Sequence, residues 1–227
     1  MKNSQTAQDQ TQDQIISEPP RDCALCPRLA AFRAQNQAKF PDKFNAPVPS
    51  WGDKSAAFLI VGLAPGLRGA NFTSRPFTGD FAGDLLYSTL RTFGFASGTY
   101  AARPDDGLAL INCRITNAVR CVPPENKPTG DEIKTCQRFL EATFAEMEHL
   151  KVILALGKIA HDAVLRTFGE KLSAHKFAHN AAHNLTTKTG KPLLLIDSYH
   201  CSRYNTQTGR LTEAMFHDVF ETIKSEV

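Results

Sequence analysis

Residues 56–80, AAFLIVGLAPGLRGANFTSRPFTGD, hold an apolar run followed by a glycine-rich loop. The run predicts a buried strand, and its loop lies where open α/β sheets bind ligands, just beyond the carboxyl end of a strand. Gly62 and Gly66 let the backbone approach a ligand, although an ordinary strand-to-helix connection fits these glycines equally well. Phe77 and Asp80 favour the ligand site, because an aromatic face and a carboxylate three residues apart suit a planar, hydrolysable ligand.

Outward from this stretch, apolar runs alternate with helical patterns along the chain. The runs are near-continuous, as in strands covered on both faces, and occupy about 56–62, 109–119, 151–156 and 192–198. The helical patterns occupy about 80–94, 130–149 and 157–168, followed by an amphipathic segment with Leu211, Phe216, Val219, Phe220 and Ile223. Thr129 and Glu132 have the spacing of a capping box. The alternation predicts an α/β fold, a mainly parallel sheet sandwiched between helices.

Length and composition predict one domain. The 227 residues suit a single α/β domain, for which we expect residues 15–227. Residues 1–14 are glutamine-rich and polar without apolar periodicity, so we expect a disordered tail there. No apolar stretch reaches the ~18 residues that span a bilayer, and no export signal is recognisable, which predicts a cytoplasmic protein. The net charge of +3 permits a polyanionic partner without demanding one.

Six cysteines in a reducing cytoplasm indicate metal chemistry, catalysis or packing rather than disulfides. Cys23 and Cys26 form a C-x2-C pair, whereas Cys121 and Cys136 flank a proline-rich turn and the first part of a predicted helix. Four thiolates suit either an iron-sulfur cluster or tetrahedral zinc, and the single short pair makes zinc the less natural choice without excluding it. From the cysteines alone, a cluster, zinc and no metal have equal weight. Cys113 lies in an apolar run and is expected in the core.

Unusually polar segments lie at the ends of two of the predicted strands. Asn117 offers both the donor and the acceptor that reading a nucleobase edge requires, although a single asparagine is more often a turn or capping residue. His200 is able to polarise a developing oxyanion, although a single histidine after a strand is more often structural. Three further histidines spaced by four would line a helical face for a metal, but suit a polar excursion equally well: His175, His179 and His183.

Four ordered motifs carry a family resemblance. With the four cysteines at 23, 26, 121 and 136, they resemble the uracil-DNA glycosylase superfamily, most strongly family five, the type b enzymes: GLAPG at 62–66, PFTGD at 76–80, ITNAVRCVPPENKP at 115–128 and HCSRYNTQTGRLT at 200–212. The resemblance covers residues from about 22 to 224. It implies a three-layer sandwich around a mainly parallel, four-stranded sheet, and removal of uracil and related deaminated bases from double-stranded DNA. It also implies a four-iron-four-sulfur (4Fe-4S) cluster on Cys23, Cys26, Cys121 and Cys136.

The resemblance implies a role for each motif. The target nucleotide is extruded from the duplex, Phe77 stacks on the base and Asn117 hydrogen-bonds its Watson-Crick edge. His200 donates to the departing base, and Asp80 positions or activates water. The pocket is lined by the loop of Gly62, Leu63, Ala64, Pro65 and Gly66. The expected DNA contacts are Arg75, Lys127, Ser202, Arg203, Tyr204, Asn205 and Arg210, although a solvated surface charge is the commoner fate of any single basic residue.

Four positions depart from related motifs. Ala64 occupies the place of the catalytic aspartate of the better-known uracil glycosylases, so we expect water activation from Asp80 instead. Gly66 occupies the place of a tyrosine that excludes the thymine methyl, so we expect bulkier substrates, hypoxanthine and oxidised or etheno pyrimidines. Cys201 stands where family five usually has proline, and Ser74 where it usually has glycine.

Two functional classes therefore remain. The first is a monofunctional glycosylase that acts as a monomer and leaves an abasic site. The second is a non-catalytic or redox-sensing DNA-binding module that keeps the fold and the cluster, and the altered His-Cys-Ser motif permits it. Asp80 and Asn117 favour catalysis. The related family four is less attractive, because Leu63 stands where that family usually has glutamate.

Overall fold

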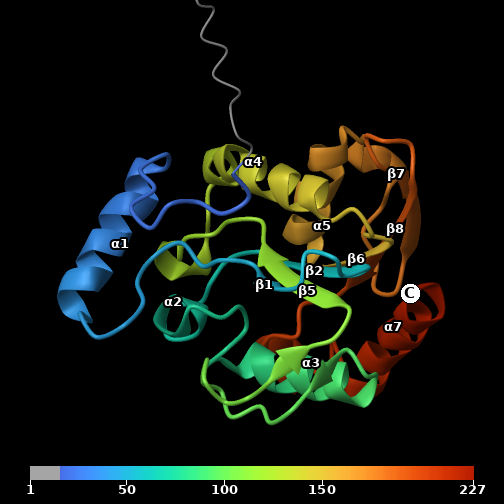
Figure 1. The fold of residues 1–227 in the computed structure, drawn as a ribbon, viewed down its shortest axis with the longest axis horizontal. Coiled ribbons are helices and arrows are strands. Elements are labelled where there is room, and N and C mark those ends of the chain that lie inside the picture. The colour runs from blue at the N-terminus through green and yellow to red at the C-terminus, as the bar shows by residue number, and fades with distance from the viewer. Residues whose placement is uncertain (1–15) are drawn as a thin grey trace, which may run out of the picture.

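The computed structural model describes residues 16–227, so the tail predicted at 1–14 lies outside the described residues. Its centre is a six-stranded sheet of order β1-β5-β2-β6-β8-β7 (Figure 1). The four inner strands are parallel: β5 (Cys113–Asn117), β2 (Phe58–Gly62), β6 (Val152–Leu156) and β8 (Pro192–Ser198). Helices cover both faces of this sheet. The predicted α/β sandwich around a mainly parallel sheet is confirmed.

The edges of the sheet are antiparallel strands that the sequence did not reveal. β1 (Trp51–Gly52) pairs with β5, and β7 (Ala182–Thr186) pairs with β8. β1 is too short to show a period, and β7 is polar and largely exposed. The predicted strand at 109–119 is divided between β5 and β4 (Ala109–Leu110), which pairs with β3 (Ala96–Ser97) in a second sheet. Asn112, at φ 49°, interrupts it, and its Oδ1 accepts a hydrogen bond from the Ala57 amide at 2.7 Å.

Successive side chains of β2 point to opposite faces of the sheet, and each face is covered by its own layer of helices. Phe58 and Ile60 face the side covered by α3 (Phe81–Thr92) and α7 (Glu213–Glu226). Leu59 and Val61 face the side covered by α4 (Gly130–Glu146) and α5 (Lys158–Phe168). Figure 1 shows the first pair of helices below the sheet and the second pair above it. Both faces of β2 are therefore sealed, as its unbroken apolar run predicts.

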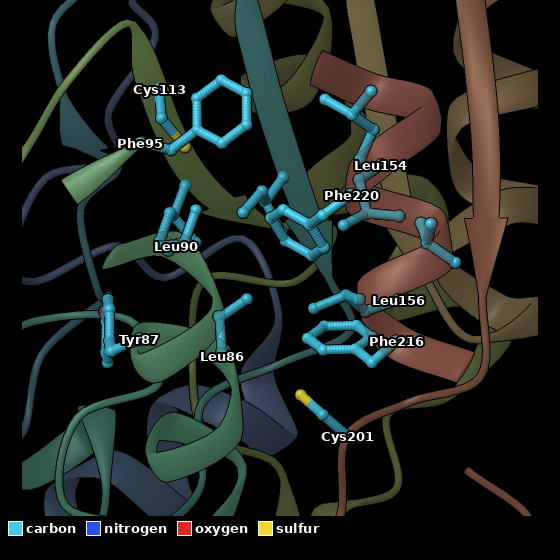
Figure 2. Close-up of a cluster of buried hydrophobic side chains, with 14 of the residues drawn as sticks. Leu86, Tyr87, Leu90, Phe95, Cys113, Leu154, Leu156, Cys201, Phe216 and Phe220 are labelled. Carbon is cyan, nitrogen blue, oxygen red and sulfur yellow. The ribbon is translucent and has the colours of Figure 1, made fainter. Parts of the chain in front are cut away.

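The layer between the sheet and the helices α3 and α7 is the larger core (Figure 2). Leu86 and Leu90 of α3 and Phe216 and Phe220 of α7 are fully buried in it. Cys201 lies in the same layer with a fully buried side chain, and burial, together with the nearby charge of Asp80, raises the pKa of its thiol to about 12. The thiol therefore packs as a protonated apolar group. Cys113 is also in this core, as expected.

The remaining elements are short or peripheral. They are α1 (Pro27–Lys39), α2 (Ala70–Thr73), the 3-10 turns η1 (Pro124–Asn126) and η2 (Leu172–Ala174), and α6 (Arg203–Gln207). The predicted capping box at the start of α4 is confirmed, because the Thr129 and Glu132 side chains each accept a hydrogen bond from the other residue's backbone. Among residues 16–227, none of the helices has the length and apolarity that crossing a membrane requires.

Candidate functional site

The carboxyl ends of the four parallel strands meet at one edge of the sheet. β2 ends at Gly62 and β5 at Asn117, and these two residues are partners in the register of the sheet. β6 runs into Gly157, and β8 leads through Ser198 and Tyr199 into His200. The segments singled out from the sequence therefore converge where parallel sheets bind ligands.

Gly62, Phe77 and Asn117 form the inner wall of the site. Phe77 and Asn117 are 7% and 3% exposed. A Cβ at Gly62 would collide with Asn117 Oδ1 and lie 2.7 Å from Phe77 Cζ. Both side chains therefore close on the backbone of Gly62 and leave no room for a larger residue. The structure brings together an aromatic face and an amide, as predicted for a site that binds a planar base.

Phe77 lies in a strained turn. Its φ of 51° is in the left-handed region, which costs a residue with a side chain on the order of 1 to 3 kcal/mol. Ser74, three residues earlier, ends α2 at φ 67°, so this serine adopts a conformation that glycine adopts more readily. The rings of Phe77 and His200 lie 6.0 Å apart at 34° to one another. Strain of this kind persists only where the surroundings hold it, and it is common at binding sites.

Asp80 caps α3 and faces the glycine-rich loop. Its Oδ1 accepts a hydrogen bond from the Gly83 amide at 3.2 Å. Cβ atoms at Gly66 and Gly69 would lie 3.3 and 2.6 Å from Asp80 Oδ2, so both glycines make space for the carboxylate. Burial raises the pKa of Asp80, and the backbone hydrogen bonds from Gly83 and Ala82 offset part of the rise. A largely desolvated carboxylate therefore lies beside the loop.

His200 is held from the opposite side. Its backbone carbonyl accepts a hydrogen bond from Asn205 Nδ2 at 2.8 Å, and a Cβ at Gly157 would lie 3.6 Å from His200 Cβ. Burial lowers the pKa of the imidazole, so it is neutral at neutral pH and keeps one ring N–H to donate. Cys201, next to it, fills the core where proline was expected.

The residues predicted to contact DNA differ in their surroundings. Ser202 caps α6 and accepts a hydrogen bond from the Asn205 amide at 3.4 Å, and Tyr204 on α6 is 71% exposed. The Arg203 guanidinium lies 5.2 Å from the centre of the Phe81 ring, at the start of α3. These residues place an exposed helix beside His200. Arg210 lies above the ring of Tyr199, which directly precedes His200, and Lys127 lies beside Glu125.

The prediction for Arg75 is wrong. It was predicted to contact DNA phosphate, but its side chain is 4% exposed and its guanidinium is engaged by Asp106. Two hydrogen bonds of 2.8 Å join the guanidinium nitrogens to the two carboxylate oxygens. A buried, fully paired arginine is not available to a phosphate on the surface.

The four cysteines at 23, 26, 121 and 136 line one small cavity. Their surroundings are the N-terminus of α1, the segment after β5 and the first half of α4, packed around Leu29, Val119 and Phe139. Arg33 Nη1 donates to Cys121 Sγ at 3.6 Å, and the Arg120 amide donates to Cys136 Sγ at 3.4 Å. Burial raises the pKa of Cys121 to about 12 and that of Cys136 to about 11, so these thiols are protonated until a cation binds.

The spacing of the sulfurs argues against a single zinc ion. Zinc bonded to four sulfurs at about 2.3 Å would hold them about 3.8 Å apart. Within residues 16–227, the one group of three metal-ligand atoms within 4.8 Å of one another is His161, His183 and Asp197, and it contains no cysteine. Four thiols that line one cavity at a wider spacing fit a larger, multinuclear metal group.

The group of His161, His183 and Asp197 is a hydrogen-bonded network. Asp197 Oδ1 lies 2.7 Å from His161 Nδ1, and Asp197 Oδ2 lies 3.0 Å from His183 Nε2. His161 Nε2 lies 2.9 Å from the His175 carbonyl oxygen. Both ring nitrogens of His161 face acceptors, which favours the doubly protonated ring, and the hydrogen bond with Asp197 contributes to a pKa raised above that of a free imidazole. The polar excursion is the alternative that the structure supports over a helical face of histidines, because His175 and His179 lie in a loop and His183 lies in β7.

Sequence reasoning missed Gly83, Gly157, Arg33 and Asp197. A Cβ at Gly83 would collide with the Phe77 carbonyl oxygen, and Gly157 borders His200. The only available signal was the place of Gly157 directly after an apolar run. Arg33 reads as an ordinary helical residue, and Asp197 as the end of an apolar run.

Comparison with known proteins gives a consistent result. The family model of the uracil DNA glycosylase superfamily matches residues 49–224. A type-5 uracil-DNA glycosylase of Thermus thermophilus is 45% identical over 207 residues, which cover 89% of this chain and 92% of the relative. A type-5 enzyme of Pyrobaculum aerophilum is 36% identical, with 84% and 82% covered. A type-4 uracil-DNA glycosylase of the same organism is 31% identical, with 70% and 67% covered. Sequence identity is thus higher to these two type-5 proteins than to the type-4 protein.

Proposed function

The chain belongs to the uracil-DNA glycosylase superfamily, and from this membership we propose that it excises uracil from DNA by hydrolysing the N-glycosidic bond, leaving an abasic site. The observation that carries the proposal is the convergence of Phe77 and Asn117 on Gly62 at the carboxyl edge of the sheet. An aromatic face and an amide edge together make a slot for a flat, hydrogen-bonding ligand. A pyrimidine base fits that description.

Base binding requires extrusion of the nucleotide from the duplex. Unpairing and unstacking cost a few kcal/mol and are least costly for a mispaired base such as uracil opposite guanine. We assign Phe77 to stacking on the extruded base and Asn117 to its Watson-Crick edge. The backbone from Gly62 to Gly66 lines the pocket. The buried position of both side chains supports this assignment, because a desolvated amide discriminates strongly against a ligand that leaves it unpaired.

Bond cleavage places negative charge on the departing base and positive charge on the sugar. We assign His200 as the donor that stabilises the base anion, a role in which one positioned hydrogen bond is worth ~3 kcal/mol. Its lowered pKa supports a neutral imidazole that donates without first having to be charged. We assign Asp80 to the sugar side, where its carboxylate stabilises the cation and orients the attacking water. The Asp80 carboxylate lies against Gly66 and Gly69, beside the glycine-rich loop that lines the proposed pocket.

The range of bases extends beyond uracil in this proposal. Among the described residues, a Cβ added at Gly66 would meet only Asp80 Oδ2, at 3.3 Å, so no bulky side chain narrows the pocket there. We propose hypoxanthine and oxidised or etheno pyrimidines as further substrates. A uracil-only enzyme in a panel of lesion duplexes would contradict this part of the proposal.

DNA contacts are proposed for α6 and its flanks. Tyr204, the most exposed aromatic residue among the large hydrophobics of the described chain, stands beside His200 with Arg203 and Asn205. We propose that these three residues enter the duplex and occupy the space that the extruded base leaves. Ser202, Arg210 and Lys127 are proposed for the flanking backbone. A monomer is sufficient for this mode of binding, and the cytoplasm, where deaminated DNA is accessible, is the proposed compartment.

A 4Fe-4S cluster on Cys23, Cys26, Cys121 and Cys136 is part of the proposal. All four thiols line one cavity, their spacing is too wide for one zinc ion, and two of them accept N–H hydrogen bonds, a contact that tunes such clusters. When bound, the group supplies four metal-thiolate bonds that tie α1, α4 and the segment after β5 together. Excision itself is assigned to Asp80, at the start of α3, and His200, in the segment after β8.

The proposed function is tested by abasic-site formation. Anaerobically purified protein is incubated with duplexes that carry one uracil, hypoxanthine or thymine opposite guanine, and alkali then reveals abasic sites. We expect cleavage of the uracil duplex by the wild type and loss of cleavage in Asp80→Ala. If the wild type binds DNA but cleaves none of the duplexes, the chain is a non-catalytic binding module and the proposal is wrong.

A further inference from the structure

The turn that carries Phe77 is bound from several sides at once. Its left-handed backbone at φ 51° requires external support, because phenylalanine does not adopt this conformation readily. The hydroxyl of Tyr87 donates to the carbonyl of Pro76, and the hydroxyl of Tyr100 donates to the carbonyl of Phe77 at 3.3 Å. Both carbonyls that flank the strained φ and ψ angles are therefore fixed by tyrosines from other segments of the chain.

Arg75 closes the turn on itself. Its Nε donates to Thr78 Oγ1 at 2.7 Å, so one guanidinium bridges the residues on either side of Pro76 and Phe77. Its other two nitrogens donate to the two oxygens of Asp106 at 2.8 Å each. Asp106 in turn accepts hydrogen bonds from the amides of Ala101 and Leu108, so the ion pair is fixed to a loop with its own structure.

Three aromatic rings surround the ion pair. The Arg75 guanidinium carbon lies 4.9 Å from the centre of the Trp51 ring, 5.6 Å from that of Tyr87 and 5.8 Å from that of Tyr100. The side chains of Arg75 and Asp106 are 4% and 0% exposed. A planar, weakly hydrated guanidinium suits such a site, because it forms bidentate hydrogen bonds to a carboxylate and stacks on aromatic rings at the same time. Lysine offers neither the fork nor the stacking.

We propose that the Arg75–Asp106 pair, with the Tyr100 hydroxyl, is a clamp that positions Phe77 for stacking on the extruded base. Arg75, Asp106 and Tyr100 are positioning residues in this proposal, because they act through the turn and not on the base. The inference rests on the proposed function, since it needs a base for Phe77 to stack on. The clamp keeps the ring in place before DNA arrives, so that stacking does not have to order the turn.

The space around the turn makes the clamp necessary. The Phe77 carbonyl lies against Gly83, where even a Cβ would collide with it, and the Phe77 ring lies against Gly62. The ring is thus confined between two backbone segments, and a rotation of the turn would move it off the base site. Because Asp80 follows Phe77 by three residues and caps α3, the same clamp holds the start of the segment that carries the carboxylate.

An ion pair on the other side of the sheet offers a matched control. Arg114 is 5% exposed and donates to Glu146 at 3.0 Å, yet neither residue touches the turn at 75–80. Glu146→Gln removes a carboxylate from a buried arginine, as Asp106→Asn does, but Arg114 keeps Glu18 as a second partner at 3.5 Å. A general loss of stability would appear in both variants, whereas a loss of Phe77 positioning would appear only in Asp106→Asn.

The experiment compares two affinities of the iron-loaded full-length protein. The first is for a duplex with one uncleavable 2′-fluoro-arabino-uridine opposite guanine, and the second is for the same duplex without it. Their ratio reports stacking and base reading, because contacts to the backbone are common to both. The variants are Arg75→Lys, Asp106→Asn, Tyr100→Phe and Glu146→Gln. Melting temperature and iron content are measured for each, together with single-turnover cleavage of the uracil duplex.

We expect the affinity ratio to fall about tenfold in Arg75→Lys and Asp106→Asn, and less in Tyr100→Phe, as loss of base stacking predicts. We expect Glu146→Gln to keep the affinity ratio and the cleavage rate of the wild type, even if its melting temperature falls as far as that of Asp106→Asn. An unchanged affinity ratio in folded Arg75→Lys and Tyr100→Phe would overturn the clamp. If Asp106→Asn does not fold, these two variants alone test the proposal. Absence of cleavage by the wild type refutes the proposed function instead, and is seen before any variant is compared.

Discussion

Gly62 and Asn117 are register partners at the ends of β2 and β5, and the Asn117 amide oxygen lies so close to Gly62 that no side chain fits between them. The Phe77 ring closes the same gap, with its Cζ 2.7 Å from where a Cβ would stand. The width of the proposed base slot is thus set by the backbone of β2. Substitution of that glycine tests the slot directly.

Gly62→Ala should lower the rate of uracil excision on the order of 100-fold while leaving the protein folded. The added methyl group has to displace either the amide or the aromatic ring, and a displacement of about 1 Å is enough to lower a rate on the order of 100-fold. Single-turnover cleavage of a uracil duplex gives the rate. Gly130→Ala is the control, because a Cβ at Gly130 would meet nothing within 4 Å. Full activity in Gly62→Ala would show that the slot lies elsewhere.

Asp80→Asn should lose activity and gain stability at neutral pH. Burial raises the pKa of Asp80, so the folded state is favoured by protonation and this contribution is lost as pH rises through the raised pKa. Asparagine removes the buried charge and still caps the helix, because its side-chain oxygen also accepts the Gly83 amide. Chemical denaturation at neutral pH measures the free energy of unfolding. A large loss of stability would show that the carboxylate is favourably solvated in the fold.

The same raised pKa predicts an acid limb in the activity of the wild type. Asp80 has to be ionised to stabilise the sugar cation, so the rate falls as pH decreases through a value above the 3.8 of an ordinary aspartate. His200, neutral at neutral pH, adds no loss on the alkaline side of its own lowered pKa. Single-turnover rates across a pH series give the profile. A rate that stays constant down to the ordinary aspartate pKa would contradict the role of Asp80.

Cys136→Ala should release the proposed cluster and lower the melting temperature by more than loss of one buried thiol explains. The wild type should contain iron and acid-labile sulfide, and the variant should contain neither. Cys113→Ala is the matched control, because Cys113 is equally buried but lies in the other core, away from the four clustered cysteines. Iron content and thermal denaturation are measured side by side. Retention of iron in the Cys136 variant would exclude it as a ligand.

His161 should stabilise the protein more at acidic than at alkaline pH. Burial lowers its pKa, but the hydrogen bond and charge of Asp197, with the His175 carbonyl, outweigh burial, and the pKa is raised above 6.5. The contribution is therefore complete below the pKa of the unfolded state and is lost as pH rises through the higher folded value. The difference in unfolding free energy between wild type and His161→Gln should shrink accordingly. Exposed His149, replaced in the same way, is the control for the general effect of losing a histidine.

Much of the fold was predictable, because the inner strands are covered on both faces. β2, β6 and β8 begin and end within a few residues of the apolar runs that predicted them. The edge strands were not, because β1 has two residues and β7 carries polar side chains toward solvent. The division of the run at 109–119 depends on Asn112, whose contact with Ala57 bridges distant segments of the chain.

The site divides in the same way. Gly62, Phe77, Asp80, Asn117 and His200 were predicted as site residues because each belongs to a motif at or after the end of a predicted strand. The burial of Arg75 was not predicted, because a charged residue is expected at the surface until its partner, Asp106, is known. The His161–Asp197 pair escaped for the same reason, since 36 residues separate the two side chains. Long-range ion pairs leave no local pattern in a sequence.

The strand order also determines when the site comes into being on a growing chain. β2 pairs with β5 and β6, but β8, which leads to His200, joins β6 last among the parallel strands. Parallel pairs need crossover connections and form slowly, since distant segments have to meet. A nascent chain that has released β5 but not β8 contains Phe77, Asp80 and Asn117 but lacks His200. Of the proposed site residues, His200 is therefore synthesised last, and its segment follows the strand that completes the parallel part of the sheet.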